Sequence, residues 1–156
     1  MTKPRFLDYF LVALQFSLFG LYLWPVSWPY ALPDMVLWPA QLAMIVGLIL
    51  LFAALGQIGF KISPFPRPKE NTVLISWGVF GIVRHPIYSG IILFAVGMGL
   101  YQEDLYKLFI SFLLFVLFYF KSSYEERNMR KFFPEYKDYQ KRVGRFFPKV
   151  LRGTKP

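Results

Sequence analysis

The polar residues best suited to chemistry in this chain stand directly before one of its most apolar segments. Arg84 and His85, the only histidine, precede Pro86, and residues 87–102 carry no charge. Proline is favoured in the first turn of a helix, so the sequence predicts a helix that starts at Pro86 with His85 as its cap. The first amides of such a helix have no intrahelical partner and lie at the positive end of its dipole. Together with Arg84 they would favour an anion.

A plainer interpretation of these residues is also open. Arg84 and His85 could anchor the apolar helix among lipid phosphates, as basic residues commonly do at membrane boundaries. Charge placement alone does not separate an anchor from a ligand site.

Two adjacent carboxylates follow a later apolar segment. Arg130 lies four residues after Glu126, the favourable order for a helix ion pair, so we interpret Glu126 as a surface residue paired with Arg130. Glu125 has only Lys121 four residues before it, in the poorer order. Near an anion-binding helix start, Glu125 would suit a zwitterionic ligand whose amino group meets this carboxylate.

Four apolar segments could position these residues. The chain has 156 residues, of which 56% are hydrophobic and 21% aromatic, outside the range usual for soluble domains. Residues 35–60 lack any charge and are long enough to cross a hydrocarbon core of about 30 Å. A removable signal peptide would explain the first segment, but no cleavage pattern follows it. We therefore expect an all-α membrane protein of one domain, residues 1–156, with four transmembrane helices at about 6–24, 35–60, 86–101 and 104–121.

The basic residues predict the orientation of these spans. Seventeen of the 18 Lys and Arg residues fall on one side of the predicted topology, and only Lys107 falls on the other. Lys and Arg remain on the cytoplasmic side, so both termini, the middle loop and His85 are expected in the cytoplasm. The net charge of +9 then indicates attraction to anionic membrane lipids rather than to nucleic acid.

The middle loop and the tail, residues 122–156, are expected to form a cytoplasmic cap. Three prolines within residues 64–68 favour an extended path, and residues 72–75 have the character of a short extended stretch. In the tail, Pro134 should end one helix near Phe133, and a second should cover residues 135–143.

Composition also limits the possible cofactors. With no cysteine and one histidine, the chain has no thiolate site and no histidine cluster for zinc, haem or iron. It also lacks the strand, glycine-rich turn and helix of a dinucleotide-binding fold. Any cofactor should be organic, with no bound metal.

Two motifs make the sequence recognisable. VRHPIYSG, followed by EERNMRKFFPEYKDYQKRV, resembles the paired signature of the isoprenylcysteine carboxyl methyltransferase and phospholipid methyltransferase family. The resemblance covers about residues 63–148 and implies S-adenosylmethionine as the cofactor. It implies cofactor contacts from Thr72, Val73, Leu74, Ile75, Phe80, His85, Pro86, Ile87, Tyr88 and Glu125.

Three further positions complete the expected site. Arg84 is the candidate catalytic residue, since it could hold an anionic substrate or the cofactor carboxylate. Lys121 stands where prenylcysteine-specific relatives carry an arginine that meets the substrate, which makes it the candidate substrate-binding residue. Phe80 replaces a tyrosine of some members and so lacks its hydroxyl.

These residues lead us to expect a methyltransferase that acts on a lipophilic acceptor arriving from the bilayer. Methyl transfer from a sulfonium needs orientation more than acid–base catalysis. Methylation of a carboxylate oxygen or a thiol is preferred, with phospholipid N-methylation as the alternative. A non-enzymatic lipid-binding or scaffold protein is the alternative of another class. A reductase similar to the sterol reductases is disfavoured because those chains have many more spans.

Overall fold

The computed structural model describes residues 5–59 and 74–149. Throughout these residues the regular structure is helical, with two isolated β-bridges and no strand. The elements are α1 (Phe6–Leu23), a 3-10 turn (Asp34–Val36), α2 (Leu37–Ile58), α3 (Val79–Ile82), α4 (Pro86–Tyr101), α5 (Leu105–Phe132) and α6 (Tyr136–Arg142). The all-α prediction is therefore confirmed for the described residues.

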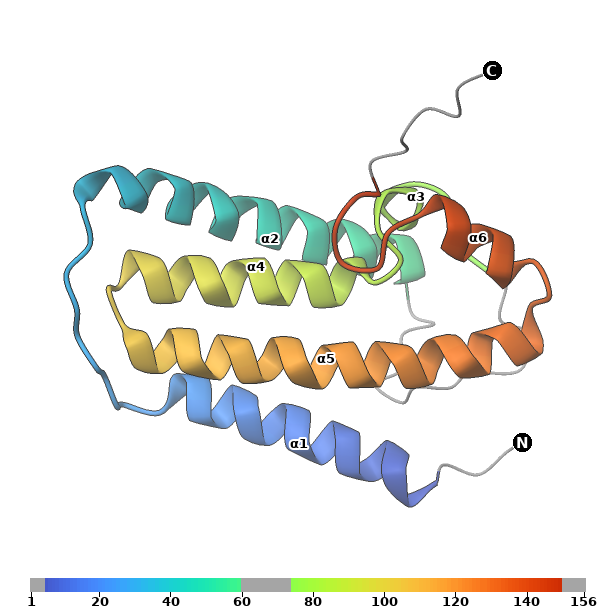
Figure 1. The fold of residues 1–156 in the computed structure, drawn as a ribbon, viewed down its shortest axis with the longest axis horizontal. Helices are drawn as coiled ribbons and strands as arrows, with labels where there is room; N and C mark the ends of the chain where they lie inside the picture. Colours follow the sequence, from blue (N-terminus) through green and yellow to red (C-terminus); the bar gives the residue numbers. More distant parts are fainter. Residues whose placement is uncertain (1–4, 60–73, 150–156) are drawn as a thin grey trace.

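Helices α1, α2, α4 and α5, the long helices of the described residues, lie side by side (Figure 1). Helix α4 lies between α2 and α5, and α1 packs on the other side of α5. Helices α1 and α4 begin, and α2 and α5 end, at the same end of the bundle, where α3 and α6 also lie. We call this the site end, because it carries the residues identified from the two motifs.

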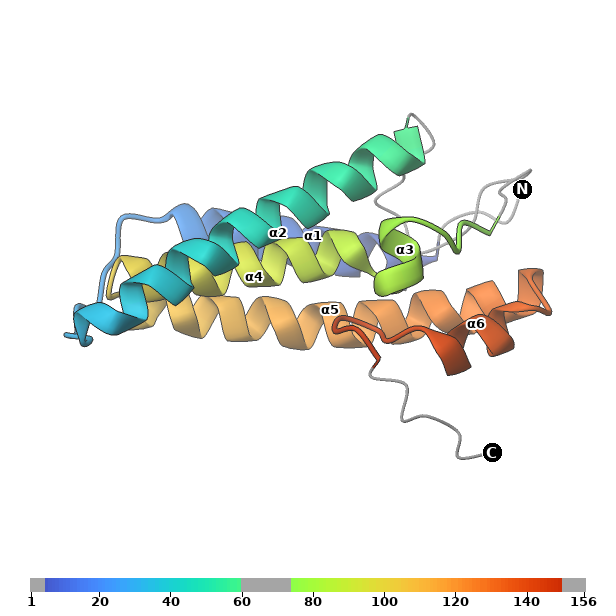
Figure 2. The same cartoon turned by 90° about the horizontal axis from the view of Figure 1, so that it is seen from above.

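Glycines allow α2 and α4 to approach closely, and Figure 2 shows α2 crossing α4 at an angle. A Cβ atom added at Gly90 would lie 2.6 Å from the carbonyl oxygen of Gly47, and one added at Gly97 would lie 2.7 Å from that of Ala40. Small residues at such a crossing are common where helices pack within a membrane. This contact fixes α4, whose first turn belongs to the candidate site.

Among the residues that the structure describes, three helical segments are long and apolar enough to cross a membrane: Phe6–Leu23, Asp34–Ile58 and Leu105–Phe132. Helix α4 is apolar as well but has only 16 residues. The four predicted spans thus coincide with helices in the structure. That all four helices cross the membrane stays a prediction. The side of the membrane that each helix end faces also stays a prediction.

The structure tests the predictions for the tail but only a small part of those for the middle loop. Pro134 does separate two helices, since α5 ends at Phe132 and α6 begins at Tyr136. Thr72, Val73 and the proline-rich part of the middle loop lie outside the described residues. Leu74 and Ile75 are described and have no regular secondary structure.

Candidate functional site

The site is built around the residues that precede α4. His85 is the N-cap of this helix and Pro86 its first residue, as the sequence predicts. The backbone amide of Arg84 donates to Gly144 O at 2.8 Å, and that of His85 donates to Arg145 O at 3.1 Å. The segment 143–147, after α6, therefore returns to lie along the start of α4.

A tight turn makes this return possible. A Cβ atom added at Gly144 would lie 1.9 Å from the carbonyl oxygen of Phe147, so this position requires glycine. Further along, the Ser89 hydroxyl donates to Phe146 O at 2.9 Å and attaches the segment to the first turns of α4. Sequence reasoning missed this segment, although a glycine shortly after a short helix could have indicated the turn.

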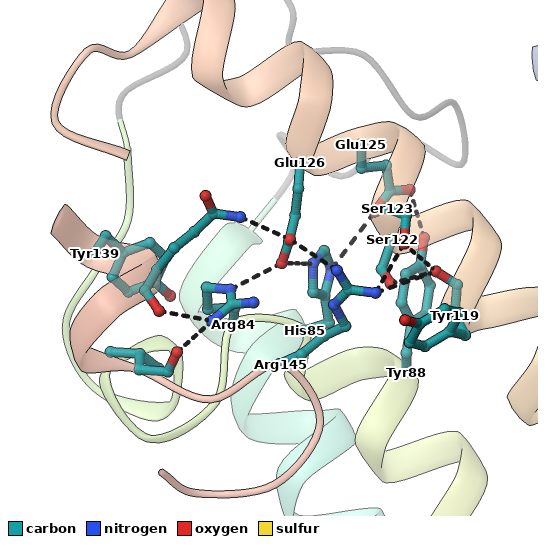
Figure 3. Close-up of polar contacts among 12 residues, drawn as sticks. Arg84, His85, Tyr88, Tyr119, Ser122, Ser123, Glu125, Glu126, Tyr139 and Arg145 are labelled. Atoms are coloured by element: carbon teal, nitrogen blue, oxygen red, sulfur yellow. Dashed lines mark hydrogen bonds and ion pairs between the residues drawn. The ribbon is translucent and has the colours of Figure 1, made fainter. Parts of the chain in front are cut away.

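Glu126 lies at the centre of the site, with 2% of its side chain exposed. Its Oε1 lies 2.8 Å from Arg84 Nε and 3.1 Å from His85 Nε2 (Figure 3). Its Oε2 accepts from Gln140 Nε2 at 2.7 Å and lies 3.2 Å from Arg145 Nη2. This one carboxylate thus joins α5 to the residue before α4, to α6 and to the segment 143–147.

The interpretation of Glu126 as a surface residue paired with Arg130 is wrong. Arg130 instead contacts the Gln140 side chain at 3.5 Å, whereas Glu126 is buried against Arg84. The pairing rule for residues four apart applies only to side chains on one helix. It therefore cannot predict partners that come from other helices or loops far along the chain.

Arg84 and Glu126 form a buried ion pair, and each of them has further hydrogen-bond partners. Arg84 has 9% of its side chain exposed, and besides Glu126 it donates to the carbonyl oxygens of Gln140 and Val143. Glu126 lies beyond the apolar part of α5. Burial raises the pKa of this carboxyl, but the contacts with His85 and Arg84 outweigh burial and lower it to about 2. Glu126 is therefore ionised at neutral pH.

Glu125 has a different environment one residue earlier. Its Oε1 accepts from the Tyr88 hydroxyl at 2.6 Å, and its Oε2 lies 3.5 Å from His85 Nδ1. Burial raises the pKa of Glu125, an effect that His85 and Tyr88 oppose. The side chain is 18% exposed, so Glu125 is the more accessible of the two carboxylates.

His85 lies between these carboxylates, with one ring nitrogen facing each of them (Figure 3). The ring also stacks on Tyr88, with centroids 5.5 Å apart, and Tyr88 stacks in turn on Phe118 at 4.4 Å. His85 is thus held in place by its contacts with both carboxylates and by aromatic packing, the arrangement of an orienting residue.

Lys121 belongs to the same neighbourhood although it points into the bundle. Its side chain is 1% exposed, its Nζ lies 5.6 Å from the centroid of the Tyr88 ring, and it donates to Gln15 Oε1. The structure therefore brings together Arg84, His85 and Tyr88 of the first motif, Glu125 of the second, and Lys121, which precedes the second motif by one helical turn.

The remaining expected site residues lie around this group. Leu74 packs against the cluster of Tyr136, Tyr139 and Val143, while the Phe80 carbonyl accepts from the Tyr139 hydroxyl. Leu74 therefore contacts α6 and Val143, the residue after it, and Phe80 is hydrogen-bonded to α6. Pro86 is buried, and Ile75 and Ile87 are half-buried.

A family model described as phospholipid methyltransferase matches residues 35–136. This range contains most of the site residues and covers more than half of the chain. The chain belongs to the phospholipid methyltransferase family. The resemblance seen in the two motifs is thereby confirmed.

Two curated proteins that are similar to this member of the phospholipid methyltransferase family are named as metal resistance proteins. The cobalt-zinc-cadmium resistance protein CzcN of Cupriavidus metallidurans is 28% identical over 109 residues, which is 64% of this chain and 50% of the relative. The nickel-cobalt-cadmium resistance protein NccN of Alcaligenes xylosoxydans xylosoxydans is 32% identical over 85 residues, 53% of this chain and 39% of the relative. The match spans half or less of the length of these relatives.

Proposed function

We propose that the protein is an S-adenosylmethionine-dependent methyltransferase that acts in the membrane on a lipophilic acceptor. Two observations support this: the family match, and a partly exposed Glu125 oriented by His85 and Tyr88. The second observation carries the proposal for this chain, because it identifies an oriented carboxylate that is available to a ligand.

The described residues fit the charges of this cofactor. Its amino acid part carries an ammonium, for which Glu125 offers an oriented and accessible carboxylate, whereas the Glu126 carboxylate is already surrounded by four donors. His85, Ile87 and Tyr88 would line the pocket, together with Leu74, Ile75, Phe80 and Pro86, and Thr72 and Val73 belong to the same proposed set. When bound, the cofactor supplies an electrophilic methyl group on its sulfonium.

The protein's own residues would act by orientation. His85 and Tyr88 hold Glu125 in one position, and Arg84 holds Glu126 and thereby the elements that close the site. We therefore propose that Arg84 contributes to catalysis by positioning rather than by proton transfer. Accurate positioning of reacting groups can supply about 7 to 11 kcal/mol of a barrier.

The acceptor would reach the site from the bilayer. We propose that Lys121, next to Tyr88, contacts it, and we favour methylation of a carboxylate oxygen or a thiol. The family description favours a second candidate, N-methylation of a phospholipid. The names of the two relatives connect them with resistance to metal ions. Among residues 5–59 and 74–149, no group of three or more His, Cys, Asp or Glu side chains could hold a metal ion.

The proposed topology has α1, α2, α4 and α5 as four membrane crossings, with the site end in the cytoplasm. The distribution of basic residues supports this orientation, as does the common end of the bundle at which α1 begins and α5 ends. Membrane lipids are then direct neighbours of the protein, and the cytosolic cofactor has access to Glu125.

The experiment that tests this function is product analysis. The detergent-purified protein is incubated with cofactor carrying a labelled methyl group and with a lipid extract, and labelled products are identified by mass spectrometry. A labelled lipid carboxylate ester or thioether supports the preferred reaction, and a labelled amine head group supports the second candidate. No labelled product, together with no cofactor binding, would favour a lipid-binding or scaffold protein.

A further inference from the structure

The end of the bundle opposite the site end contains a pocket. We call this the far end; α1 and α4 end there, and α2 and α5 begin there (Figure 1). The pocket has a volume of about 710 Å³ and is partly open to its surroundings. Its lining residues are distinct from those of the candidate site. Binding pockets for small molecules commonly measure about 300 to 1,000 Å³, so this one is large enough for part of a lipid.

The body of the pocket is apolar. Side chains from the end of α1 and from the second half of α4 line it: Tyr22, Leu23, Phe94 and Met98. The Tyr22 hydroxyl donates to Ala95 O at 2.8 Å, which joins α1 to α4 beside the pocket and satisfies the polar group of the tyrosine. This wall therefore suits a hydrocarbon chain.

The two carboxylates at the turn between α4 and α5 are occupied by backbone amides. Asp104 also lines the pocket, and its Oδ1 accepts from the amides of Trp28 at 3.1 Å and Tyr106 at 2.9 Å. Oε1 of Glu103 accepts from the amide of Leu32 at 2.7 Å. Both acids thus attach the connection between α1 and α2 to this turn.

Lys107 brings a positive charge to the same pocket. Its side chain is half-buried, and its Nζ donates to Oε1 of Gln102, which is a neutral partner. Within the described part of the chain, no carboxylate lies within 4.0 Å of this ammonium. An apolar wall with a cation at one side suits an amphiphile whose head group is anionic.

The length of α4 places this cation within reach of lipid head groups. A helix of 16 residues rises about 24 Å, which is less than the hydrocarbon core of about 30 Å. A bilayer accommodates a short helix by local thinning and by long polar side chains near the helix end. Lys107 lies in the first turn of α5, next to the end of α4, and so meets the phosphates of the leaflet at the far end.

We propose that this pocket binds a membrane phospholipid, with one acyl chain against Phe94 and Met98 and the phosphate at Lys107. The bound lipid belongs to the leaflet at the far end, whereas the proposed methyl transfer takes place at the site end. This inference therefore does not rest on the proposed function. It also gives a role to Lys107, the one basic residue that the predicted topology assigns to this side.

The test is native mass spectrometry of the full-length protein in a nonionic detergent. The protein is titrated with dioctanoyl phosphatidylglycerol and, separately, with dioctanoylglycerol, which has the same chains but no phosphate. The fraction of protein with one bound lipid gives an apparent dissociation constant for each. The wild type should bind phosphatidylglycerol about tenfold more tightly, equivalent to about 1.4 kcal/mol. Millimolar inorganic phosphate should not displace it, because phosphate has no acyl chain.

Two pairs of variants test the two halves of the pocket. Lys107→Gln should reduce the preference to less than about twofold, while Lys107→Arg keeps it. Lys141→Gln is the matched control, because this exposed lysine lies on α6 at the site end, and it should retain the preference. Met98→Trp fills the apolar part and should weaken binding of both lipids at least fivefold. Phe112→Trp, on an exposed face of α5 outside the pocket, is its control and should bind as the wild type does.

A wild type that binds the two lipids equally overturns the proposal, as does a Lys107→Gln protein with the wild-type preference. Wild-type binding of both lipids by Met98→Trp would show that the lipid lies elsewhere on the protein. Displacement of phosphatidylglycerol by inorganic phosphate would reduce the site to a simple anion site and also overturn the proposal. Loss of the preference in Lys107→Gln alone, together with weaker binding of both lipids by Met98→Trp, supports it.

Discussion

The Nε atom of Arg84 lies 2.8 Å from Oε1 of Glu126, and this buried ion pair joins the residue before His85 to the last turns of α5. The two residues are 42 positions apart in the chain. Their contact brings the two sequence motifs together and places Glu125 beside His85 and Tyr88.

Replacement of Glu126 should destabilise the protein. Glu126→Gln leaves the Arg84 charge buried without its partner, and loss of one member of a buried pair costs about 3 to 5 kcal/mol. The measurement is thermal unfolding in detergent followed by intrinsic fluorescence. Asp138→Asn, which breaks the exposed pair with Lys141, is the control and should leave the unfolding midpoint unchanged. Equal midpoints for the wild type and Glu126→Gln would contradict the central position of this carboxylate.

Acid should weaken the fold through the same residue. The pKa of Glu126 is about 2 in the folded protein against an ordinary value of 4.5. A lowered folded pKa contributes stability that is fully present above pH 4.5 and is lost as the pH falls from 4.5 toward 2. The unfolding free energy of the wild type should therefore fall more steeply over this interval than that of Glu126→Gln. Parallel curves for the two proteins would show that Glu126 titrates normally.

The turn at Gly144 should tolerate no side chain. Gly144→Ala places a Cβ atom 1.9 Å from Phe147 O, so the segment 143–147 must move from the start of α4. Limited proteolysis should then cleave the tail several times faster than in the wild type. Gly20→Ala is the control, because a Cβ atom there meets nothing within 4 Å. Equal cleavage of the two alanine variants would mean that the segment is not held at the start of α4.

Local patterns were sufficient to predict the helices. Pro86 and Pro134 mark boundaries because proline restricts its own backbone and that of the residue before it, and those effects need no tertiary context. The uncharged run within residues 35–60 predicts α2 for a similar reason, since its length alone matches a membrane. Both features depend only on residues close together in the sequence.

The interior of the site could be predicted only in part. The motif resemblance placed Glu125, His85 and Tyr88 in one expected site, and in the structure these side chains are in contact. The burial of Glu126, by contrast, depends on Gln140 and Arg145, which reach it only after the chain turns back at Pro134 and Gly144. The Gln15 to Lys121 bond joins residues 106 positions apart. No pattern within one helix encodes such a partner, because either side chain could equally have faced lipid.

Glu125 and Glu126 offer the most direct test of the central claim, that this site holds S-adenosylmethionine through Glu125. Calorimetric titration of the cofactor into the wild type and Glu125→Gln compares them directly. Loss of one member of a desolvated charge pair costs about 2 to 4 kcal/mol, so affinity should fall by about 30- to 700-fold in Glu125→Gln. The unfolding midpoint should change far less than in Glu126→Gln, because Glu125 is the more exposed carboxylate. Cofactor binding by Glu125→Gln with the affinity of the wild type would contradict the account.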